Sequence, residues 1–322
     1  MDNSTYTNEI MHINDFKNTN EIEHTNYLFS DKYEIKSPIG EGGGGIVYLA
    51  WDRHLECSVA IKEEKHPQGA EGTGVLKAEM EFLKTLKHPM LPTVFDYFST
   101  DKRYLVMEYI KGIGLHKYIE KEGKIQEEQA CEWALQLLDL LSYLHNHKPA
   151  IIYRDLKPEN IIVCPDLKLR VIDFGAALYI NYDGSRQENL AGTPGYAAPE
   201  QLNDYGQNAD NADERSDIYT FGATMYHMLT GFNPSLPPYG IRPLRCINPE
   251  LTSGIERIVL KCTEKEPSKR YQCVEEIKRD IERRKYLKKR TYFAGFGKRR
   301  QYVIKRLEKN IWLTEKKTTG LI

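Results

Sequence analysis

The sequence contains no long hydrophobic run and no paired cysteines. No stretch of 18 consecutive apolar residues occurs, so a membrane-spanning helix is not expected. The six cysteines are scattered, without the C-x-x-C spacing that would indicate a zinc site or a redox pair. The N-terminus, Met1-Asp2-Asn3-Ser4, lacks the basic and then apolar pattern of a secretion signal. We therefore expect reduced thiols and a cytoplasmic protein.

Net charge is also nearly absent, but the charge is unevenly distributed. The chain carries 45 Lys and Arg against 46 Asp and Glu, and residues 281–322 hold 14 of the basic residues and only three acidic ones. The body is therefore acidic, and no specific nucleic-acid partner is expected. In the basic tail, residues 287–322, apolar residues share one face of an expected amphipathic helix. Such a helix can lie on an anionic membrane or bind an acidic partner, but packing on the chain's own acidic body is slightly favoured.

Residues 1–32 form a polar lead-in. Six asparagines precede Leu28, and the apolar residues are too few to offset the entropy lost on ordering the whole stretch. The apolar cluster at 27–29 is able to dock on the domain that follows. We assign this extension no chemical role.

One polar loop holds three groups suited to phosphate chemistry. It reads Tyr-Arg-Asp-Leu-Lys-Pro-Glu-Asn over residues 153–160 and precedes an apolar run. Asp155 is suited to accept the proton of a hydroxyl, Lys157 to neutralise charge on a transferred phosphoryl group, and Asn160 to offer an oxygen to Mg²⁺. An ordinary polar turn is the alternative for this octapeptide alone. The other motifs of the chain must decide between a catalytic loop and a polar turn.

A glycine-rich segment lies between two expected strands near the start of the chain. Gly40, Gly42 and Gly45 satisfy the spacing G-x-G-x-x-G. Glycine lets backbone N–H groups approach phosphate oxygens that a Cβ would keep away. Dinucleotide-binding folds use the same spacing, but between a strand and a helix. No Lys-Ser/Thr follows Gly45, which excludes a Walker-A loop.

A lysine closes the next β-branched strand and has an expected partner on a helix. The strand ends in Val-Ala-Ile-Lys at Lys62, and residues 74–86 show helical apolar spacing. A carboxylate on this helix would fix the Lys62 ammonium against nucleotide phosphates. Glu79 and Glu81 are both candidates. Glu79 is favoured because Leu83, one turn later, shares its expected inward face.

Two further stretches complete the expected nucleotide site. The strand over residues 104–110 offers backbone groups of Glu108 and Ile110 to an adenine edge, with Met107 packing behind it; an ordinary internal strand fits equally well. Asp173, in Asp-Phe-Gly, follows the apolar stretch 169–172. Its carboxylate could complete a magnesium site with Asn160 and nucleotide phosphates.

A polar segment of 22 residues, expected to be irregular, connects Asp-Phe-Gly to Ala-Pro-Glu. A phosphate on Ser185 or Thr193 could be captured by Arg154, which precedes Asp155, and this would order the segment. For Thr193 a structural role is favoured, in which its hydroxyl bridges Asp155 and Lys157.

A helix starting at Asp217, with Ser216 as its cap, is apolar almost all round and is therefore expected to be buried. Asp217 is expected to cap the backbone of the loop that holds Asp155. Further along, Arg270 is expected to form a structural ion pair with Glu200. The stretch between Glu200 and Asp217 includes a polar insertion over residues 203–212.

In order and near the usual spacing, these motifs resemble the eukaryotic-like (Hanks-type) serine/threonine protein kinase family, in its bacterial form. The matching elements are the glycine loop, Val-Ala-Ile-Lys, the helix Glu, Tyr-Arg-Asp, Asp-Phe-Gly and Ala-Pro-Glu. Tyr153 stands where most members have His, a change that some active members carry. The insertion over 203–212 is the second departure and could alter the surface that receives the substrate.

The resemblance implies an α+β, bilobal fold over residues 33–286, with a small β-rich N-lobe (33–110) and a larger helical C-lobe (111–286). It implies ATP and Mg²⁺ as cofactors, with Mn²⁺ as an alternative, and protein substrates phosphorylated on Ser or Thr, including the activation segment itself. A pseudokinase scaffold and a small-molecule kinase are the competing functions. The implied catalytic residues are Asp155 and Lys157, and the implied metal ligands are Asn160 and Asp173. The implied nucleotide-binding residues are Ile39, Gly40, Gly42, Gly43, Gly45, Val47, Ala60, Lys62, Glu79, Met107, Glu108, Ile110 and Ile162.

Overall fold

A computed structural model of the chain describes residues 31–42, 45–64, 75–100, 102–180, 192–202 and 212–284, together with the backbone of 27–29. The fold is α+β and divides into two units. The first combines Met1–Tyr118 with Pro158–Ala177, and the second combines Ile119–Lys157 with Leu178–Ile322. Residues 158–177 thus group with the N-terminal part of the chain, although the sequence-based division placed them in the C-lobe.

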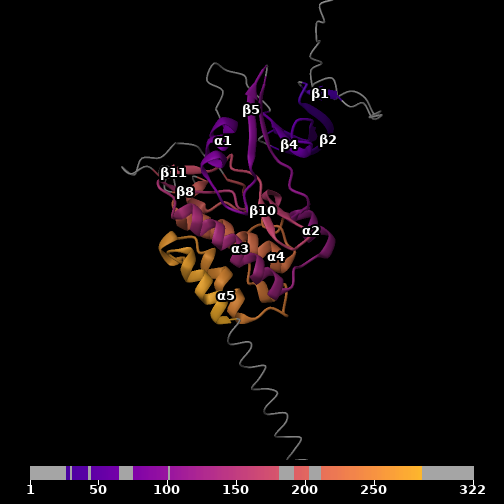
Figure 1. The fold of residues 1–322 in the computed structure, drawn as a ribbon. Coiled ribbons are helices and arrows are strands. Elements are labelled where there is room, and N and C mark those ends of the chain that lie inside the picture. Colours follow the sequence, from indigo (N-terminus) through magenta and orange to yellow (C-terminus); the bar gives the residue numbers. More distant parts are fainter. Residues whose placement is uncertain are drawn as a thin grey trace, which may run out of the picture. The chain divides into compact units, whose positions relative to one another are not determined.

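A six-stranded antiparallel sheet forms most of the first unit (Figure 1). Its strand order is β1-β2-β3-β4-β6-β5. The strands are β1 (Tyr27–Phe29), β2 (Tyr33–Gly42), β3 (Gly45–Asp52), β4 (Cys57–Glu63), β5 (Val94–Ser99) and β6 (Arg103–Glu108). Through β1, the backbone at the end of the expected polar lead-in pairs with β2.

Strand alternation gives this sheet two different faces. One face carries a cluster of buried side chains, among them Val59 and Ile61 of β4 and Val106 of β6. Residues directly opposite each other in an antiparallel pair share a face, and neighbours along a strand alternate. Lys62 and Met107 therefore belong to the other face. Helix α1 (Val75–Thr85) packs against β5 and β6 and buries Leu76, Phe82 and Leu83.

A second, three-stranded sheet completes the first unit. It has the order β10-β9-β7 and consists of β7 (Ile113–Gly114), β9 (Ile161–Val163) and β10 (Leu169–Val171), with a 3₁₀ turn, η2 (Pro158–Asn160), leading into β9. The β7–β9 pairing brings the chain at Gly112 very close to β9. A Cβ on Gly112 would lie 2.5 Å from the Val163 carbonyl oxygen, so glycine is required there.

The second unit is mainly helical. Three of its helices are α3 (Glu127–His145), α4 (Glu214–Thr230) and α5 (Ser253–Cys262), and α4 packs against both of the others (Figure 1). Fourteen of the residues of α4 are buried, which matches the all-round apolar pattern expected there. The remaining elements are α2 (Leu115–Glu122), which links the units along the chain, the paired strands β8 (Ala150–Ile152) and β11 (Leu178–Ile180), the 3₁₀ turns η3 (Pro199–Gln201), η4 (Leu244–Cys246) and η5 (Pro267–Lys269), and a helix over residues 274–284.

Three local predictions were wrong. The cap of α4 is Asp213, whose side chain accepts the Arg215 N–H, because the helix begins earlier than expected. The hydroxyl of Ser216, the expected cap, donates instead to Glu200. The segment expected to be irregular after Asp-Phe-Gly contains β11, because its apolar residues at 178–180 pair with β8. The strand expected to reach residue 110 ends at Glu108.

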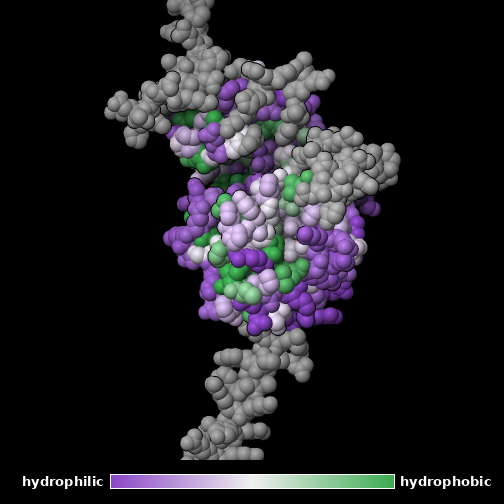
Figure 2. Space-filling model, turned by 180° about the vertical axis from the view of Figure 1, so that it is seen from behind, coloured by the Kyte–Doolittle hydropathy of each residue, from purple (hydrophilic) through white to green (hydrophobic). Residues whose placement is uncertain are grey.

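The surface of the described residues is largely hydrophilic. Seen from behind, an apolar area is set among hydrophilic residues on the larger, lower part (Figure 2). The exposed large apolar side chains include Phe232, Leu236 and Tyr239, which follow α4. Within the ranges that the structure describes, no helix combines the length and apolar character needed to span a bilayer.

Candidate active site

The sheet of the first unit lines up four of the predicted nucleotide-binding residues on one face. Val47 of β3 lies opposite Lys62 of β4, and Ala60 of β4 lies opposite Met107 of β6. Since Ala60 and Lys62 are two residues apart, all four side chains share a face. Sequence periodicity suggested the individual strands, but this common face depends on the register between them.

The glycine-rich turn joins β2 to β3, between two strands as expected. Gly45 has a φ of 145°, and a Cβ there would lie 1.9 Å from the Glu63 carbonyl oxygen, so the fold itself requires this glycine. At Gly42 a Cβ would meet no atom within 4 Å. Packing within the chain therefore does not explain Gly42, whereas close approach of a phosphate would. Ile39 and Gly40 lie on β2, and Gly43 falls outside the described residues.

A buried ion pair joins β4 to α1. The Lys62 ammonium donates to Glu79 Oε2 at 2.6 Å, and the Lys62 and Glu79 side chains are 8% and 0% exposed. Glu81, the rival candidate, is exposed. Lys62 also donates to Asp173 Oδ1 at 3.1 Å, and the Phe174 N–H donates to Glu79 Oε1 at 3.2 Å. The three predicted charged residues thus form one connected network.

Burial and charge act in opposite directions on Lys62. Burial disfavours the ammonium, but the negative charges of Glu79 and Asp173 outweigh it and raise the pKa of Lys62 above its ordinary value. Burial, the largest influence on Glu79, raises the pKa of its carboxyl, and the attraction of Lys62 opposes this. Lys62 therefore remains a cation at neutral pH, as required of a group that contacts phosphate oxygens.

The two predicted metal ligands lie at the same end of the β9–β10 hairpin. Ile161 pairs with Val171, so Asn160 precedes one strand where Ile172 and Asp173 follow the other. The Ile172 N–H donates to the Asn160 carbonyl oxygen at 3.1 Å. Their side chains offer a carboxamide and a carboxylate, both hard oxygen donors of the kind that Mg²⁺ prefers. No cluster of three or more His, Cys, Asp or Glu suited to a metal ion occurs in the described ranges.

One backbone group of Glu108, at the end of β6, already forms a hydrogen bond within the chain. The Glu108 N–H donates to the Thr93 carbonyl oxygen at 2.8 Å, which leaves the Glu108 carbonyl as its backbone group for an adenine edge. Ile110 is buried two residues later. Ile162, the remaining predicted lining residue, lies half-buried in β9, opposite Gly114 on one side and Arg170 on the other.

In the second unit, three predicted residues meet. The Thr193 hydroxyl donates to Asp155 Oδ1 at 2.8 Å, and the Lys157 ammonium lies 2.5 Å from the Thr193 hydroxyl and 2.8 Å from Asp155 Oδ2. The carboxylate is therefore held from two sides by a hydroxyl and an ammonium. Such an arrangement fixes the rotamer of a carboxylate that must receive a proton at a defined point.

The loop that carries Asp155 is held through its backbone. Asp217 accepts the Tyr153 N–H at 2.9 Å and the Arg154 N–H at 2.7 Å. Arg154 has a φ of 66°, a conformation that costs energy for a residue other than glycine and persists only when its surroundings fix it. Gln201 supplies a further restraint by donating to the Arg154 carbonyl at 3.0 Å.

Three contributors to this loop were not predicted from the sequence. Thr224 of α4 donates to the Leu156 carbonyl at 2.7 Å, and His145 of α3 lies 2.9 Å from Asp217 through Nε2. Gln201, at the end of η3, is the third. The available signal for Thr224 was a polar residue on the expected buried helix α4, which also carries the polar residues Thr220 and Thr230. His145 and Gln201 lacked such a signal, because nothing local specifies their partners.

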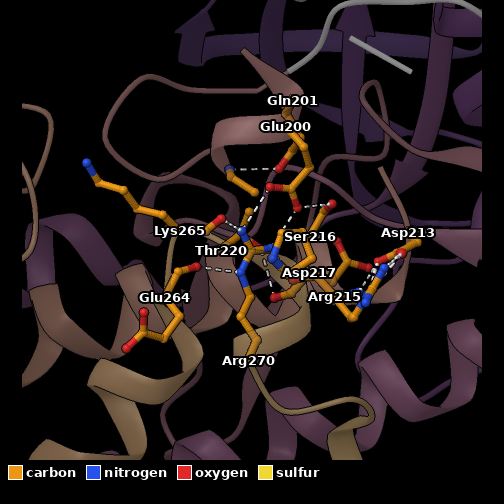
Figure 3. Close-up of polar contacts among 12 residues, drawn as sticks. Glu200, Gln201, Asp213, Arg215, Ser216, Asp217, Thr220, Glu264, Lys265 and Arg270 are labelled. Carbon is orange, nitrogen blue, oxygen red and sulfur yellow. Dashed lines mark hydrogen bonds and ion pairs between the residues drawn. The ribbon is translucent and has the colours of Figure 1, made fainter. Parts of the chain in front are cut away.

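An arginine anchors the segment that follows Thr193. Arg270 forms a two-pronged pair with Glu200, at 2.6 and 2.8 Å, and is itself 2% exposed (Figure 3). Its other hydrogen bonds go to the carbonyl oxygens of Arg215, Glu264 and Lys265, so all five guanidinium donors are used. A buried charge satisfied in this way makes Glu200 a fixed point in the chain.

Part of the prediction cannot be placed. Ser185, most of the insertion over 203–212, residues 1–26 and the basic tail from 287 lie outside the described residues. Arg154 is described and buried. Its proposed role in capturing a phosphate stays a prediction.

Comparison with known proteins identifies the family. The protein kinase domain matches residues 33–280, most of the chain. The chain belongs to the protein kinase family. This assignment agrees with the expected family and fold class.

Several bacterial relatives match this protein kinase domain. A probable serine/threonine-protein kinase of Clostridium acetobutylicum is 32% identical to this chain, and the match covers 78% of this chain and 39% of the relative. Serine/threonine-protein kinase PrkC of Bacillus subtilis is 30% identical, with 78% of this chain and 40% of the relative covered. PknB of Mycobacterium tuberculosis is 30% identical, with 79% and 43% covered. The match thus spans less than half the length of these relatives.

Proposed function

We propose that this chain transfers the γ-phosphoryl group of ATP to Ser and Thr hydroxyls of proteins, including its own activation segment. The observation that carries the proposal is the Asp155–Thr193–Lys157 arrangement, together with the Lys62–Glu79–Asp173 network. Each supplies one half of what the reaction needs. The second unit contributes a held proton acceptor, and the first contributes a fixed cation beside hard oxygen donors.

The nucleotide is bound by the first unit. Ala60, Val47, Met107 and Ile162 offer apolar contacts to the base, and the glycine turn and Lys62 receive the phosphates. Asn160 and Asp173 would hold Mg²⁺, which would neutralise charge on the nucleotide phosphates. Mn²⁺ has the same preference for oxygen ligands and is the alternative metal.

The transfer step uses residues of the second unit. The acceptor oxygen forms its bond to the γ-phosphorus as the bond to the β–γ bridging oxygen breaks, which releases ADP. Asp155 orients the hydroxyl and receives its proton, while Lys157 stabilises charge on the transferred group. Thr193 keeps the Asp155 carboxylate in place and does not itself react.

Two alternatives are less well supported. A pseudokinase would lack one of the reacting groups, yet Lys62, Asp155, Asn160 and Asp173 are all present. A small-molecule kinase would not need the anchored segment between Thr193 and Glu200, and the relatives are named as serine/threonine-protein kinases.

The test is to supply the full chain with γ-labelled ATP and Mg²⁺, first with a generic basic protein and then with sugars or aminoglycosides. We expect label on protein, as phosphoserine and phosphothreonine after acid hydrolysis. Label confined to a small molecule, or to phosphotyrosine, would contradict the proposal.

For the basic tail we propose an anionic partner surface. Residues 287–322 lie outside the described structure, and the support is the excess of basic residues in this part of the sequence. Co-sedimentation of the full chain with phosphatidylserine vesicles tests a lipid source of that charge. Binding lost in a triple variant (Lys298→Glu, Arg299→Glu, Arg300→Glu) supports it. If the wild-type chain and the triple variant pellet equally with neutral vesicles, charge attraction to the lipid is not the cause and the lipid proposal fails. The cytoplasmic location expected from the sequence stays a prediction.

A further inference from the structure

Arg170, in the middle of β10, makes a contact that the proposed reaction does not explain. Its guanidinium forms a bidentate ion pair with Glu108 at the end of β6, with Nη1 to Oε1 at 3.1 Å and Nη2 to Oε2 at 2.7 Å. Nη2 also donates to the Leu91 carbonyl oxygen at 2.9 Å. Glu108 Oε2 in turn accepts the Thr93 N–H at 3.2 Å. The Arg170–Glu108 clasp thus joins three separate stretches of the first unit.

Glu108 lies on the sheet face opposite the one that would receive the nucleotide. Glu108 is opposite Val59 in the register between β4 and β6, on the face of the buried cluster. Met107, its neighbour, points to the other face, with Ala60 and Lys62. The Glu108 carboxylate is therefore directed away from the nucleotide face. Glu108 can therefore affect nucleotide binding only through the backbone, whereas Arg170 shares a face of the β9–β10 pair with Ile162.

Both partners sit next to backbone that the nucleotide site uses. Glu108 lies in the stretch proposed to bind the adenine edge. Arg170 lies opposite Ile162 across the β9–β10 hairpin and three residues before Asp173. One ion pair thus fixes the adenine-binding strand against the hairpin that presents Ile162, Asn160 and Asp173.

The geometry specifies arginine rather than any cation. Two parallel N–H···O bonds to a carboxylate require the planar guanidinium, and a lysine could supply only a point charge. The Glu108 side chain is 34% exposed, so the pair contributes little through charge burial alone. Its contribution is mainly the relative position of the two strands.

We propose that Arg170 is a positioning residue for the nucleotide site, which it acts on through Glu108. The inference rests on the proposed function only in taking the ligand to be ATP with Mg²⁺. Without the clasp, the adenine-binding backbone and the Asp173 end of the hairpin lose their fixed separation. Nucleotide affinity then falls, while the protein-substrate side of the reaction, in the second unit, is unaffected.

The test compares full-length wild type with Arg170→Ala, Arg170→Lys and Glu108→Gln. Calorimetric titration with AMP-PNP and Mg²⁺ gives Kd, and phosphotransfer assays give KM for ATP and for a protein substrate. We expect Arg170→Ala to raise the Kd and the KM for ATP about tenfold, the effect of losing a hydrogen-bonded charge contact, with an unchanged KM for protein. Arg170→Lys and Glu108→Gln should fall between wild type and Arg170→Ala.

A control variant lies at the start of β6, the strand that ends in Glu108. Arg103 pairs with Glu64, Nη1 to Oε2 at 3.1 Å, and Arg103→Ala breaks an arginine–glutamate pair away from the hairpin, with a Glu64 side chain that is less exposed than Glu108. Its nucleotide Kd should equal that of wild type. Thermal unfolding of each variant separates a positioning effect from a general loss of stability.

Three results would overturn the proposal: an Arg170→Ala affinity equal to or tighter than wild type, equal weakening in Arg170→Ala and Arg103→Ala, or a lowered Tm with unchanged Kd. If Arg170→Ala does not fold, Arg170→Lys decides by the same criteria. Failure of wild type itself to bind AMP-PNP would instead count against the proposed function, so the two failures are distinguishable.

Discussion

Lys62 supplies the positive charge that pairs with the carboxylates of Glu79 and Asp173. Its ammonium is buried between Glu79, which is fully buried, and Asp173, whose side chain is 37% exposed. Removing the ammonium would leave the Glu79 carboxylate without its main counter-charge. Asp173 would be less affected, because water reaches it.

This arrangement predicts a loss and a recovery of stability. Lys62→Met should lower the free energy of unfolding by about 3–5 kcal/mol, the usual effect of leaving one partner of a buried ion pair alone. The double variant Lys62→Met/Glu79→Leu should recover most of that loss, because no unpaired buried charge remains. Urea unfolding of the three proteins measures both effects. A double variant as unstable as the single one would show that Glu79 is not the partner that matters.

Single residues differ in how far the sequence could predict them. Glu79 was chosen over Glu81 because helical spacing gives each residue of α1 a direction, and the ion pair is indeed formed with Glu79. Arg170 and Gln201 were not found. Their partners, Glu108 and the Arg154 carbonyl, lie 62 and 47 residues away, and only strand register and loop path bring them near.

At the scale of elements, α4 supports the loop that holds Asp155. Asp217 and Thr224 on this helix bind three backbone groups of the loop. The position of α4 is set in turn by tight packing on α5. A Cβ at Gly222 would lie 2.6 Å from Cys262 Cβ and 2.7 Å from Thr263 Cγ2. Gly222 is therefore a close-packing residue, although it stands in the middle of a helix.

Gly222→Ala should destabilise the protein despite the better helix propensity of alanine. Overpacking of this kind costs about 1–3 kcal/mol, against a propensity gain of about 1 kcal/mol. The matched control is Gly254→Ala in α5, where the nearest atom, Arg284 Cγ, would lie 3.5 Å from the new Cβ. That variant should be as stable as wild type or slightly more so. Differential scanning calorimetry compares the two Tm values, and an unchanged Tm for Gly222→Ala would refute the packing argument.

Elements with strong periodicity were predictable and short ones were not. The helix α1 was expected at 74–86 and occurs at Val75–Thr85. The strand β11 was missed because three apolar residues carry no period, and its strand character comes from pairing with β8. The cap of α4 was misplaced because Asp213 and Ser216 are both good capping residues, and sequence alone does not rank them.

At the scale of the whole molecule, the functional groups are shared between two units. The first holds the sheet face, the Lys62 network and the two oxygen donors, and the second holds Asp155 with Lys157 and Thr193. The ordered motifs were sufficient to predict the family and to place Lys62 and Asp155 in different parts of the chain, but Asn160 and Asp173 were expected in the C-lobe and group with the first unit. The substrate is not predictable in the same way, since no motif of the chain encodes it.

The most direct measurement of the central claim is phosphate transfer by Asp155→Asn. This change keeps the size of the side chain and removes its ability to take a proton. From γ-labelled ATP and Mg²⁺, transfer to protein should fall by about 10²- to 10⁴-fold, the usual contribution of a catalytic base, while the Kd for AMP-PNP stays at the wild-type value. Transfer at the wild-type rate by Asp155→Asn would contradict the account.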